Sequence, residues 1–236
     1  MKALILNSGM GKRMGVLTAE HPKCMTEIAK SETIISRQLK LLQKYGITEV
    51  IVTTGLFDRV LMDYCRSLNL SLRIIFVNNP LYAQTNYIYS IYLARQYLDN
   101  DLLLMHGDLV FEDEVLQGLI EQSLSCMTVS STLPLPVKDF KAVLSHNRII
   151  KIGIEYFKDA MAAQPLYRLK HSDWQVWLER IIDFCQQNRV NCYAEDAFNE
   201  VSACCQLYSF DVRDQLCSEI DTPEDLAVVK KRLAHL

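Results

Sequence analysis

The chain has 236 residues, of which 50% are hydrophobic and 22% charged, and its net charge is −3 at neutral pH. This length supports one large domain or two small ones with a sizeable core. The weak acidic balance excludes a general attraction to nucleic acid or anionic lipid, so any anion-binding site must be local. No apolar stretch approaches a membrane span, and the apolar run at the N-terminus is too short for a secretory signal. We therefore expect a cytoplasmic protein without a nucleic-acid or membrane partner.

The eight cysteines are scattered without paired metal-ligand spacing, and several stand inside apolar runs. In a chain of this size such a distribution is typical of reduced, mostly buried thiols rather than of a disulfide framework.

In the first half, short apolar runs alternate with helical stripes. Strands are predicted at residues 2–6, 50–52, 72–77 and 102–105, and helices at residues 34–45, 58–68 and 87–98. Gly46 is a natural end for the first of these helices. Strands that alternate with helices at this spacing indicate a parallel sheet with helices on both faces.

After about residue 125 the pattern changes. Strands are predicted at residues 126–132, 140–144 and 149–152, and the turn residues His146 and Asn147 indicate a hairpin on the far side of the sheet. An amphipathic helix is expected at residues 174–187, and a closing helix at 223–233 with Thr222 as its cap and Pro223 in its first turn. The simplest organisation is one α/β domain with a partly antiparallel second half.

A glycine-rich loop follows the first strand directly, with the sequence Ser8-Gly9-Met10-Gly11-Lys12-Arg13-Met14-Gly15. Glycines let the backbone approach a polyphosphate, exposed amides bind its oxygens, and Lys12 and Arg13 add positive charge. The spacing matches neither the dinucleotide fingerprint nor the Walker loop. On its own the loop is equally typical of a structural turn.

A second basic element, Pro22-Lys23, follows shortly afterwards. Together the two elements resemble the signature of the nucleotidyltransferase family that includes sugar-phosphate nucleotidyltransferases and phosphocholine cytidylyltransferases. The resemblance implies a Rossmann-like nucleotidyltransferase fold, a mixed and mainly parallel sheet flanked by helices. It makes residues 1–236 one domain with a nucleotide-binding half (about 1–125) and an acceptor-binding half (about 126–236). It also implies that Arg13 and Lys23 steady the phosphates as catalytic groups, with Asn7 and residues 8–12 binding the nucleotide.

Two acidic segments fit the same resemblance. Asp108 follows the strand at residues 102–105, at the edge where open α/β sheets bind ligands, and Glu219 and Asp221 share one side of an extended segment. Each alone is also typical of a cap or turn residue. Asp108, Glu219 and Asp221 match the family's metal motifs, which implies Mg²⁺ as cofactor. His106 is more typical of a packed histidine than of a metal ligand.

The segment from Asn79 to Tyr92 points to a narrower branch, because it is similar to the pattern of phosphocholine cytidylyltransferases and related small-headgroup enzymes. By analogy Gln84, Thr85 and Asn86 line the nucleotide pocket, and Thr54 and Gly55 approach the base. Tyr87 departs from the pattern, where a second asparagine is usual.

For the acceptor we weigh a quaternary choline, which favours an aromatic cage, against a primary amine such as 2-aminoethylphosphonate, which needs carboxylates or hydrogen-bond acceptors. An aromatic cage would draw on Tyr87, Tyr89, Tyr92, Trp174 and Trp177, although aromatic stripes at helical spacing are more often core. Lys141 would bind the phosphate or phosphonate, and Glu155 or Asp196 the amine; exposed charges are an equally good interpretation of these three. The candidate acceptor-binding residues are Tyr87, Lys141, Glu155 and Asp196.

The leading hypothesis is a CTP-dependent cytidylyltransferase that transfers CMP to phosphocholine or 2-aminoethylphosphonate. A phosphate or phosphonate oxygen of the acceptor would attack the α-phosphorus and release pyrophosphate, without a general base. The alternatives are a sugar-1-phosphate nucleotidyltransferase that uses UTP or dTTP, and a non-catalytic nucleotide-binding regulatory module. The oligomeric state has no signal in the sequence.

Overall fold

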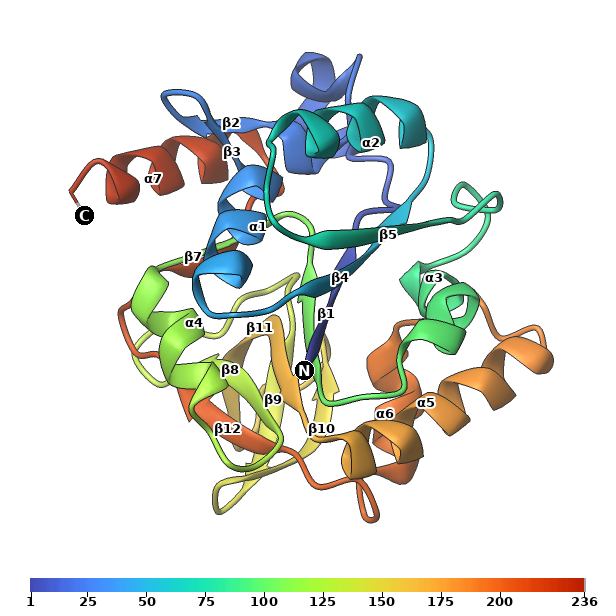
Figure 1. Cartoon of the computed structure of the whole chain (residues 1–236). Coiled ribbons are helices and arrows are strands. Elements are labelled where there is room, and N and C mark those ends of the chain that lie inside the picture. Colours follow the sequence, from blue (N-terminus) through green and yellow to red (C-terminus); the bar gives the residue numbers. More distant parts are fainter. Residues whose placement is uncertain (236) are drawn as a thin grey trace.

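The computed structural model describes residues 1–235, and its centre is a nine-stranded sheet with strands from both halves of the chain (Figure 1). The strand order is β5-β4-β1-β6-β11-β8-β12-β10-β9. These strands are β1 (Lys2–Leu6), β4 (Glu49–Thr54), β5 (Arg73–Asn78), β6 (Leu102–His106), β8 (Cys126–Ser130), β9 (Lys141–Ser145), β10 (Arg148–Gly153), β11 (Ala160–Leu169) and β12 (Tyr208–Asp211). Two small sheets pair β2 (Glu27–Ala29) with β3 (Glu32–Thr33), and β7 (Leu109–Phe111) with β13 (Cys217–Glu219).

Helices cover both faces of the sheet (Figure 1). One face packs against α1 (Ile34–Lys44), α2 (Asp58–Ser67) and α4 (Asp113–Ile120). The other packs against α3 (Tyr87–Ala94), α5 (His171–Gln186) and α6 (Ala194–Val201). The last helix, α7 (Pro223–Leu233), lies against β2, and short 3₁₀ helices occupy Lys12–Thr18, Lys23–Met25 and Arg95–Tyr97.

The first half contains the parallel part of the sheet. β1 pairs in parallel with both β4 and β6, and β4 pairs in parallel with β5. Ala3, Leu4 and Ile5 are completely buried because β1 is covered by helices on both faces, which explains its continuous apolar sequence. The carboxyl ends of β1, β4 and β6 therefore meet at one edge, where the glycine loop begins.

The second half is organised by β11, the longest strand. It pairs antiparallel with β6, β8 and β9, while β12 runs parallel to β8. Because β9 pairs with both β10 and β11, five strands form a closed circuit, β11-β8-β12-β10-β9. The α/β fold with a mixed sheet is confirmed, and antiparallel pairs are more numerous than predicted because β11 was not recognised from the sequence.

Most predicted elements of the first half are present within a few residues, and the hairpin turn at His146 (φ 55°) and the Thr222 cap of α7 are confirmed. The helix predicted at residues 87–98 is an exception, since α3 ends at Ala94 and a 3₁₀ turn follows. The elements that the sequence did not indicate are α4, α6, β11, β12 and the small sheets.

Among residues 1–235 no helix combines the length and apolar character needed to cross a bilayer. All eight cysteines are free, and five are buried, as the sequence predicts: Cys24, Cys65, Cys126, Cys205 and Cys217.

Candidate active site

The glycine loop leaves the carboxyl end of β1 and is held by backbone geometry. The backbone amide of Asn7 donates to Thr53 Oγ1 at 3.0 Å, and Thr18 Oγ1 donates to the Gly11 carbonyl at 3.0 Å. Gly11 (φ 59°) and Gly15 (φ 56°) adopt the left-handed conformation, in which glycine carries no steric penalty. A 3₁₀ helix begins directly after Gly11, and its first two residues, Lys12 and Arg13, are exposed to solvent.

Two further glycines let the neighbouring strand ends approach this loop. A Cβ atom on Gly55 would stand 2.7 Å from the Ser8 carbonyl oxygen, and one on Gly107 would stand 1.6 Å from Asn7 Oδ1. Gly55 and Thr54 therefore lie behind the loop, against its backbone, and they do not line its larger cavities. They line a small separate cavity together with Asn7, Gly9 and Met10, and their approach to the base stays a prediction.

Lys23 is the charged centre of the site. Its ammonium donates to Asp108 Oδ2 at 2.5 Å and to Asp221 Oδ1 at 2.6 Å, and its side chain is only 13% exposed. Arg13 Nη2 contacts the same Asp221 oxygen at 2.7 Å from a side chain that is 62% exposed. The geometry thus brings together both predicted catalytic cations and two of the three predicted metal ligands.

The small sheet of β7 and β13 brings these distant residues together. Leu109, the residue after Asp108, pairs with Glu219, and the Ile220 amide donates to the Asp108 carbonyl at 3.0 Å. Ile220 is buried, so Glu219 and Asp221 turn toward the site on either side of it.

His106 and Glu219 form a buried pair next to this cluster. His106 Nδ1 lies 2.8 Å from Glu219 Oε1, and ligand atoms of His106, Asp108 and Glu219 all lie within 4.8 Å of one another. Burial, together with the Asp108 charge, raises the pKa of Glu219 to about 7. Burial opposes ionisation of Asp108 as well, but the Lys23 and His106 charges bring its pKa below the ordinary value. His106 is therefore part of the site rather than a packing residue alone.

Three cavities meet at Asp108. The large cavity, about 650 Å³, is lined by the loop and by the segment from Asn79 to Ser90. The loop cavity, about 290 Å³, is lined by Asn7, Gly9, Met10, Gly11, Lys12, Arg13, Lys23, Gly107, Asp108 and Asp221, among others. The Phe140 cavity, about 410 Å³, is lined by Arg13, Asn86, Tyr87, His106, Asp108, Lys138, Asp139, Phe140, Ile154, Tyr193, Glu219 and Asp221. A ligand that spans all three would pass Asp108.

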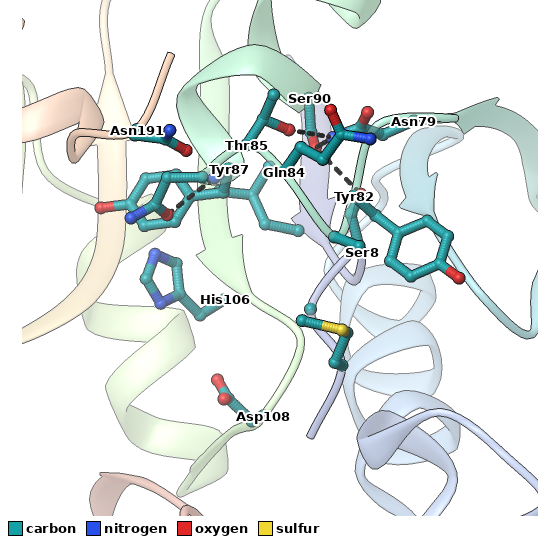
Figure 2. A pocket seen from close by; sticks show the side chains of 15 residues that line it. Ser8, Asn79, Tyr82, Gln84, Thr85, Tyr87, Ser90, His106, Asp108 and Asn191 are labelled. Atoms are coloured by element: carbon teal, nitrogen blue, oxygen red, sulfur yellow. Dashed lines mark hydrogen bonds between the residues drawn. The ribbon is translucent and has the colours of Figure 1, made fainter. Parts of the chain in front are cut away.

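Figure 2 shows the large cavity, in which a hydrogen-bond network joins its wall to the glycine loop. Asn79 Nδ2 donates to Thr85 Oγ1 (3.1 Å) and Ser90 Oγ (3.0 Å), and Ser90 Oγ donates to Ser8 Oγ at 3.0 Å. Gln84, Thr85 and Asn86 line this cavity, as do Ser8, Gly9, Met10 and Tyr87. The sequence did not single out Asn79 or Ser90 as site residues, although both stand in the segment that carries the resemblance.

Only one of the four predicted acceptor-binding residues lines these three cavities. Tyr87 lines the large and Phe140 cavities, but Lys141 is completely buried and donates to the carbonyl oxygens of Pro136 (2.5 Å) and Asp139 (3.0 Å). Asp196 caps α6 by accepting from the Tyr193 amide at 2.9 Å. Glu155 is exposed and, like Lys141 and Asp196, lines none of the three cavities.

Of the five aromatic residues considered for a cage, only Tyr87 lines one of these cavities. Trp174 and Trp177 are fully buried and donate their indole N–H groups to Leu98 and Ala194 carbonyls, whereas Tyr89 and Tyr92 stack on each other. The aromatic wall is instead formed by Tyr87, Phe140, Tyr193 and His106, with ring centroids 4.8–6.5 Å apart. Phe140 and Tyr193 come from segments without a recognisable local motif, so the sequence offered little signal for them.

The fold is that of an α/β nucleotidyltransferase. The structure superposes on a CTP:phosphocholine cytidylyltransferase from Streptococcus pneumoniae (TM-score 0.78, 18% identity, 98% of each chain). It also superposes on an inositol-1-phosphate CTP transferase from T. maritima (TM-score 0.80, 22% identity, 99% and 94% of the chains). The model of the MobA-like NTP transferase domain matches residues 3–137, and the chain belongs to this family.

Curated relatives include several cytidylyltransferases. One is a CMP-5'-(3-aminopropyl)phosphonate synthase from Streptomyces rubellomurinus, 33% identical over 50% of this chain and 19% of the relative. Another is a CTP:phosphoglutamine cytidylyltransferase from Campylobacter jejuni, 29% identical over 66% and 63%. A third is a choline-phosphate cytidylyltransferase from Streptococcus pneumoniae, 29% identical over 48% and 47%. The chain thus spans between about a fifth and two thirds of the length of these relatives.

Proposed function

We propose that this protein is a CTP-dependent cytidylyltransferase that transfers CMP to a small amino-alcohol phosphate or phosphonate, phosphocholine or 2-aminoethylphosphonate, and releases pyrophosphate. The observation that carries the proposal is the meeting of three cavities at Asp108. In this proposal the large cavity takes the nucleoside, the loop cavity the triphosphate and the Phe140 cavity the acceptor. The relatives, a CMP-phosphonate synthase and two cytidylyltransferases of phosphate-bearing acceptors, agree with it.

The charges of the cavities support this assignment. Lys12, Arg13 and Lys23 line the loop cavity together with three glycines, a combination that suits a polyphosphate. The Phe140 cavity combines Arg13 and Lys138 with carboxylates and aromatic rings. Cations bind phosphate or phosphonate, and carboxylates and aromatic faces bind an ammonium group, so this cavity suits an acceptor that carries both charges.

Mg²⁺ is the expected cofactor, and the donors present fit it. Asp108 Oδ1 is buried without a hydrogen-bond partner in residues 1–235, and its other oxygen already contacts a cation, the Lys23 ammonium. Carboxylate oxygens are the ligands Mg²⁺ prefers, and Asp108, Glu219 and Asp221 would hold it. The ion would supply positive charge to the triphosphate and the leaving pyrophosphate.

The side chains of the site then perform positioning and charge stabilisation. A phosphate or phosphonate oxygen of the acceptor forms a bond to the α-phosphorus, while the bond from the α-phosphorus to the bridging oxygen breaks and pyrophosphate leaves with the electron pair. The attacking oxygen is already ionised at neutral pH, so no general base is needed. Lys23 and Arg13 would stabilise the added charge, and the two carboxylates that hold Lys23 fix its ammonium in place.

A pyrophosphate-release screen tests the proposal. CTP, UTP, dTTP and ATP are each combined with phosphocholine, phosphoethanolamine, 2-aminoethylphosphonate and hexose-1-phosphates in the presence of Mg²⁺. We expect turnover with CTP and an amino-alcohol phosphate or phosphonate. Absence of turnover with every pair would leave the non-catalytic nucleotide-binding module as the better interpretation.

A second candidate function is a sugar-1-phosphate nucleotidyltransferase that uses UTP or dTTP. It is favoured by the similarity of the fold to a UDP-glucose pyrophosphorylase in complex with UDP-glucose (TM-score 0.80, 13% identity, 99% of this chain). A preference for UTP and a hexose-1-phosphate in the same screen would select this candidate over the first.

A further inference from the structure

Glu195 is a buried carboxylate held by two tyrosines. It lies in the first turn of α6, is 2% exposed, and accepts a hydrogen bond from Tyr167 Oη at 2.6 Å and another from Tyr87 Oη. It forms no ion pair within residues 1–235. Burying a carboxylate without a cation is costly unless its hydrogen bonds are satisfied, so the two hydroxyl groups are required partners.

The two tyrosines differ in what their rings contact. Tyr167 belongs to β11 and packs in the core, 5.6 Å from the Trp177 ring, and it lines none of the three cavities. Tyr87 begins α3 and lines both the large cavity and the Phe140 cavity. Its ring centroid lies 4.8 Å from His106 and 5.9 Å from Tyr193.

The start of α6 links Glu195 to the other side of the same cavity. Tyr193 precedes α6 and lines the Phe140 cavity. This turn is fixed by the Tyr193 amide bonded to Asp196 and by the Trp177 indole N–H, which donates to the Ala194 carbonyl at 2.8 Å. Because Glu195 is two residues further along, one rigid turn both presents the Tyr193 ring and holds the Tyr87 hydroxyl.

We infer that Glu195 is a positioning residue for the acceptor: through Tyr87 it sets the separation of the Tyr87 and Tyr193 rings, and thereby determines which headgroup the Phe140 cavity accepts. The inference rests on the proposed function, because it takes this cavity as the acceptor site. The Tyr87–Glu195 hydrogen bond joins the first residue of α3 to the first turn of α6. It links the nucleotide-binding segment to α6 in the acceptor half, in parallel with the hydrogen bond from the Asn86 amide to the Val190 carbonyl at 2.8 Å.

A pair of matched variants tests the inference. Tyr87→Phe and Tyr167→Phe each remove one hydroxyl from the same carboxylate and keep the ring. We expect Tyr87→Phe to raise the KM of the acceptor about five- to tenfold with little change in the KM of CTP, because the freed ring changes the headgroup site. Tyr167→Phe is expected to leave both KM values within about twofold of the unmodified chain, with a similar loss of thermal stability.

Variants of the carboxylate itself add a second readout. Glu195→Ala is expected to raise the KM of the acceptor at least about tenfold. Glu195→Gln keeps the shape of the side chain and one oxygen that can accept a hydrogen bond, so its KM should lie close to that of the unmodified chain. Equal effects of Tyr87→Phe and Tyr167→Phe on the acceptor KM, or a parallel change in the KM of CTP, would overturn the inference. The tyrosine pair decides the question even if Glu195→Ala does not fold.

Binding measurements separate this inference from the proposed function. Phosphocholine and 2-aminoethylphosphonate are titrated calorimetrically, with CMP present, into the unmodified chain and the two tyrosine variants. Suppose that the unmodified chain releases no pyrophosphate from any pair, and that acceptor binding is weaker only in Tyr87→Phe. This result supports the inference and contradicts the proposed function. Equal binding to both variants overturns the inference alone, and no binding to the unmodified chain overturns both.

Discussion

The two halves of the chain build their parts of the site in different ways: about residues 1–125, which we propose to bind the nucleotide (the nucleotide half), and the residues from about 126 onward, which we propose to bind the acceptor (the acceptor half). In the nucleotide half, most site residues lie in the loop after β1, directly after β6 or in one continuous segment after β5, and Lys23 begins a short 3₁₀ helix. In the acceptor half the wall consists of side chains from separate places, around Phe140, at Ile154 and at Tyr193. A parallel sheet collects strand ends at one edge by its topology, whereas the acceptor wall depends on how distant loops pack.

The two halves also differ in chemistry. The loop cavity concentrates cations around backbone amides, and the Phe140 cavity mixes both signs of charge with aromatic rings. Asp108 and Asp221 line both cavities, so changes there should affect every substrate. Changes farther from Asp108 should affect one substrate only.

The largest effect is expected at the shared centre. Asp108→Ala should lower kcat/KM by at least about a thousandfold, close to 4 kcal/mol of transition-state stabilisation, because all three cavities meet there. The far-UV circular dichroism spectrum should stay unchanged. Asp113→Ala is the matched control, an aspartate of the same half that pairs with Lys44 and lines none of the three cavities, and it should retain activity. Unchanged activity of Asp108→Ala would refute the assignment.

Removal of divalent cations should have a comparable effect. Treatment with EDTA is expected to stop pyrophosphate release, and added Mg²⁺ to restore it, since the carboxylates of Asp108 and Asp221 face the loop cavity. Asp108→Ala should show no recovery at any Mg²⁺ concentration tested. Full turnover in the presence of EDTA would contradict the metal assignment.

A substitution against the backbone of the glycine loop should affect the nucleotide half alone. Gly55→Ala places a Cβ atom 2.7 Å from the Ser8 carbonyl oxygen and must displace the glycine loop. Because misplacement by about 1 Å can be costly for catalysis, we expect the KM of CTP to rise at least about tenfold while the acceptor KM changes little. Gly9→Ala meets no atom within 4 Å, so its melting temperature should exceed that of Gly55→Ala. Equal melting temperatures would show that the close approach is not constraining.

The corresponding change in the acceptor half is Lys141→Met. It removes the donors to the Pro136 and Asp139 carbonyls but keeps an extended side chain beside Phe157. The free energy of unfolding should fall by about 1–3 kcal/mol, and the acceptor KM should rise several-fold as the segment with Lys138 and Asp139 loosens. If Lys141 instead bound the acceptor phosphate, as the sequence suggested, the loss in acceptor affinity would greatly exceed the loss in stability.

The smallest effects are expected from two matched helix caps. Thr33 caps α1 and Thr222 caps α7, each through a hydrogen bond from a backbone amide at 3.2 Å. Thr33→Ala and Thr222→Ala should each lower the free energy of unfolding by about 1 kcal/mol in chemical denaturation. Only Thr222→Ala should also lower kcat slightly, because Thr222 follows Asp221. Equal kcat values would show that Asp221 is positioned independently of the cap.

The sequence predicted the parts of the fold that local patterns encode. Apolar runs and hydrophobic periodicity located β1, α1 and β6, and the Thr222 cap with Pro223 located α7. It did not indicate β11 or α6, although β11 has ten residues. β11 is covered by strands and helices of both halves and carries no simple alternation of apolar and polar residues, so its strand conformation depends on its neighbours.

The sequence by itself predicted that the glycine loop, Lys23 and three acidic residues belong to one site. It did so because the motifs that follow the strands and the distant acidic motif resemble those of one family. Only the tertiary structure decided how they meet: β7 pairs with β13, and this pairing places Glu219 and Asp221 beside Asp108. The tertiary structure also shows that Phe140 and Tyr193 line the Phe140 cavity, whereas the predicted Lys141 and Asp196 do not. It places Glu195 within hydrogen-bond distance of Tyr87. Contacts between residues about a hundred positions apart depend on packing free energy, which no local pattern records.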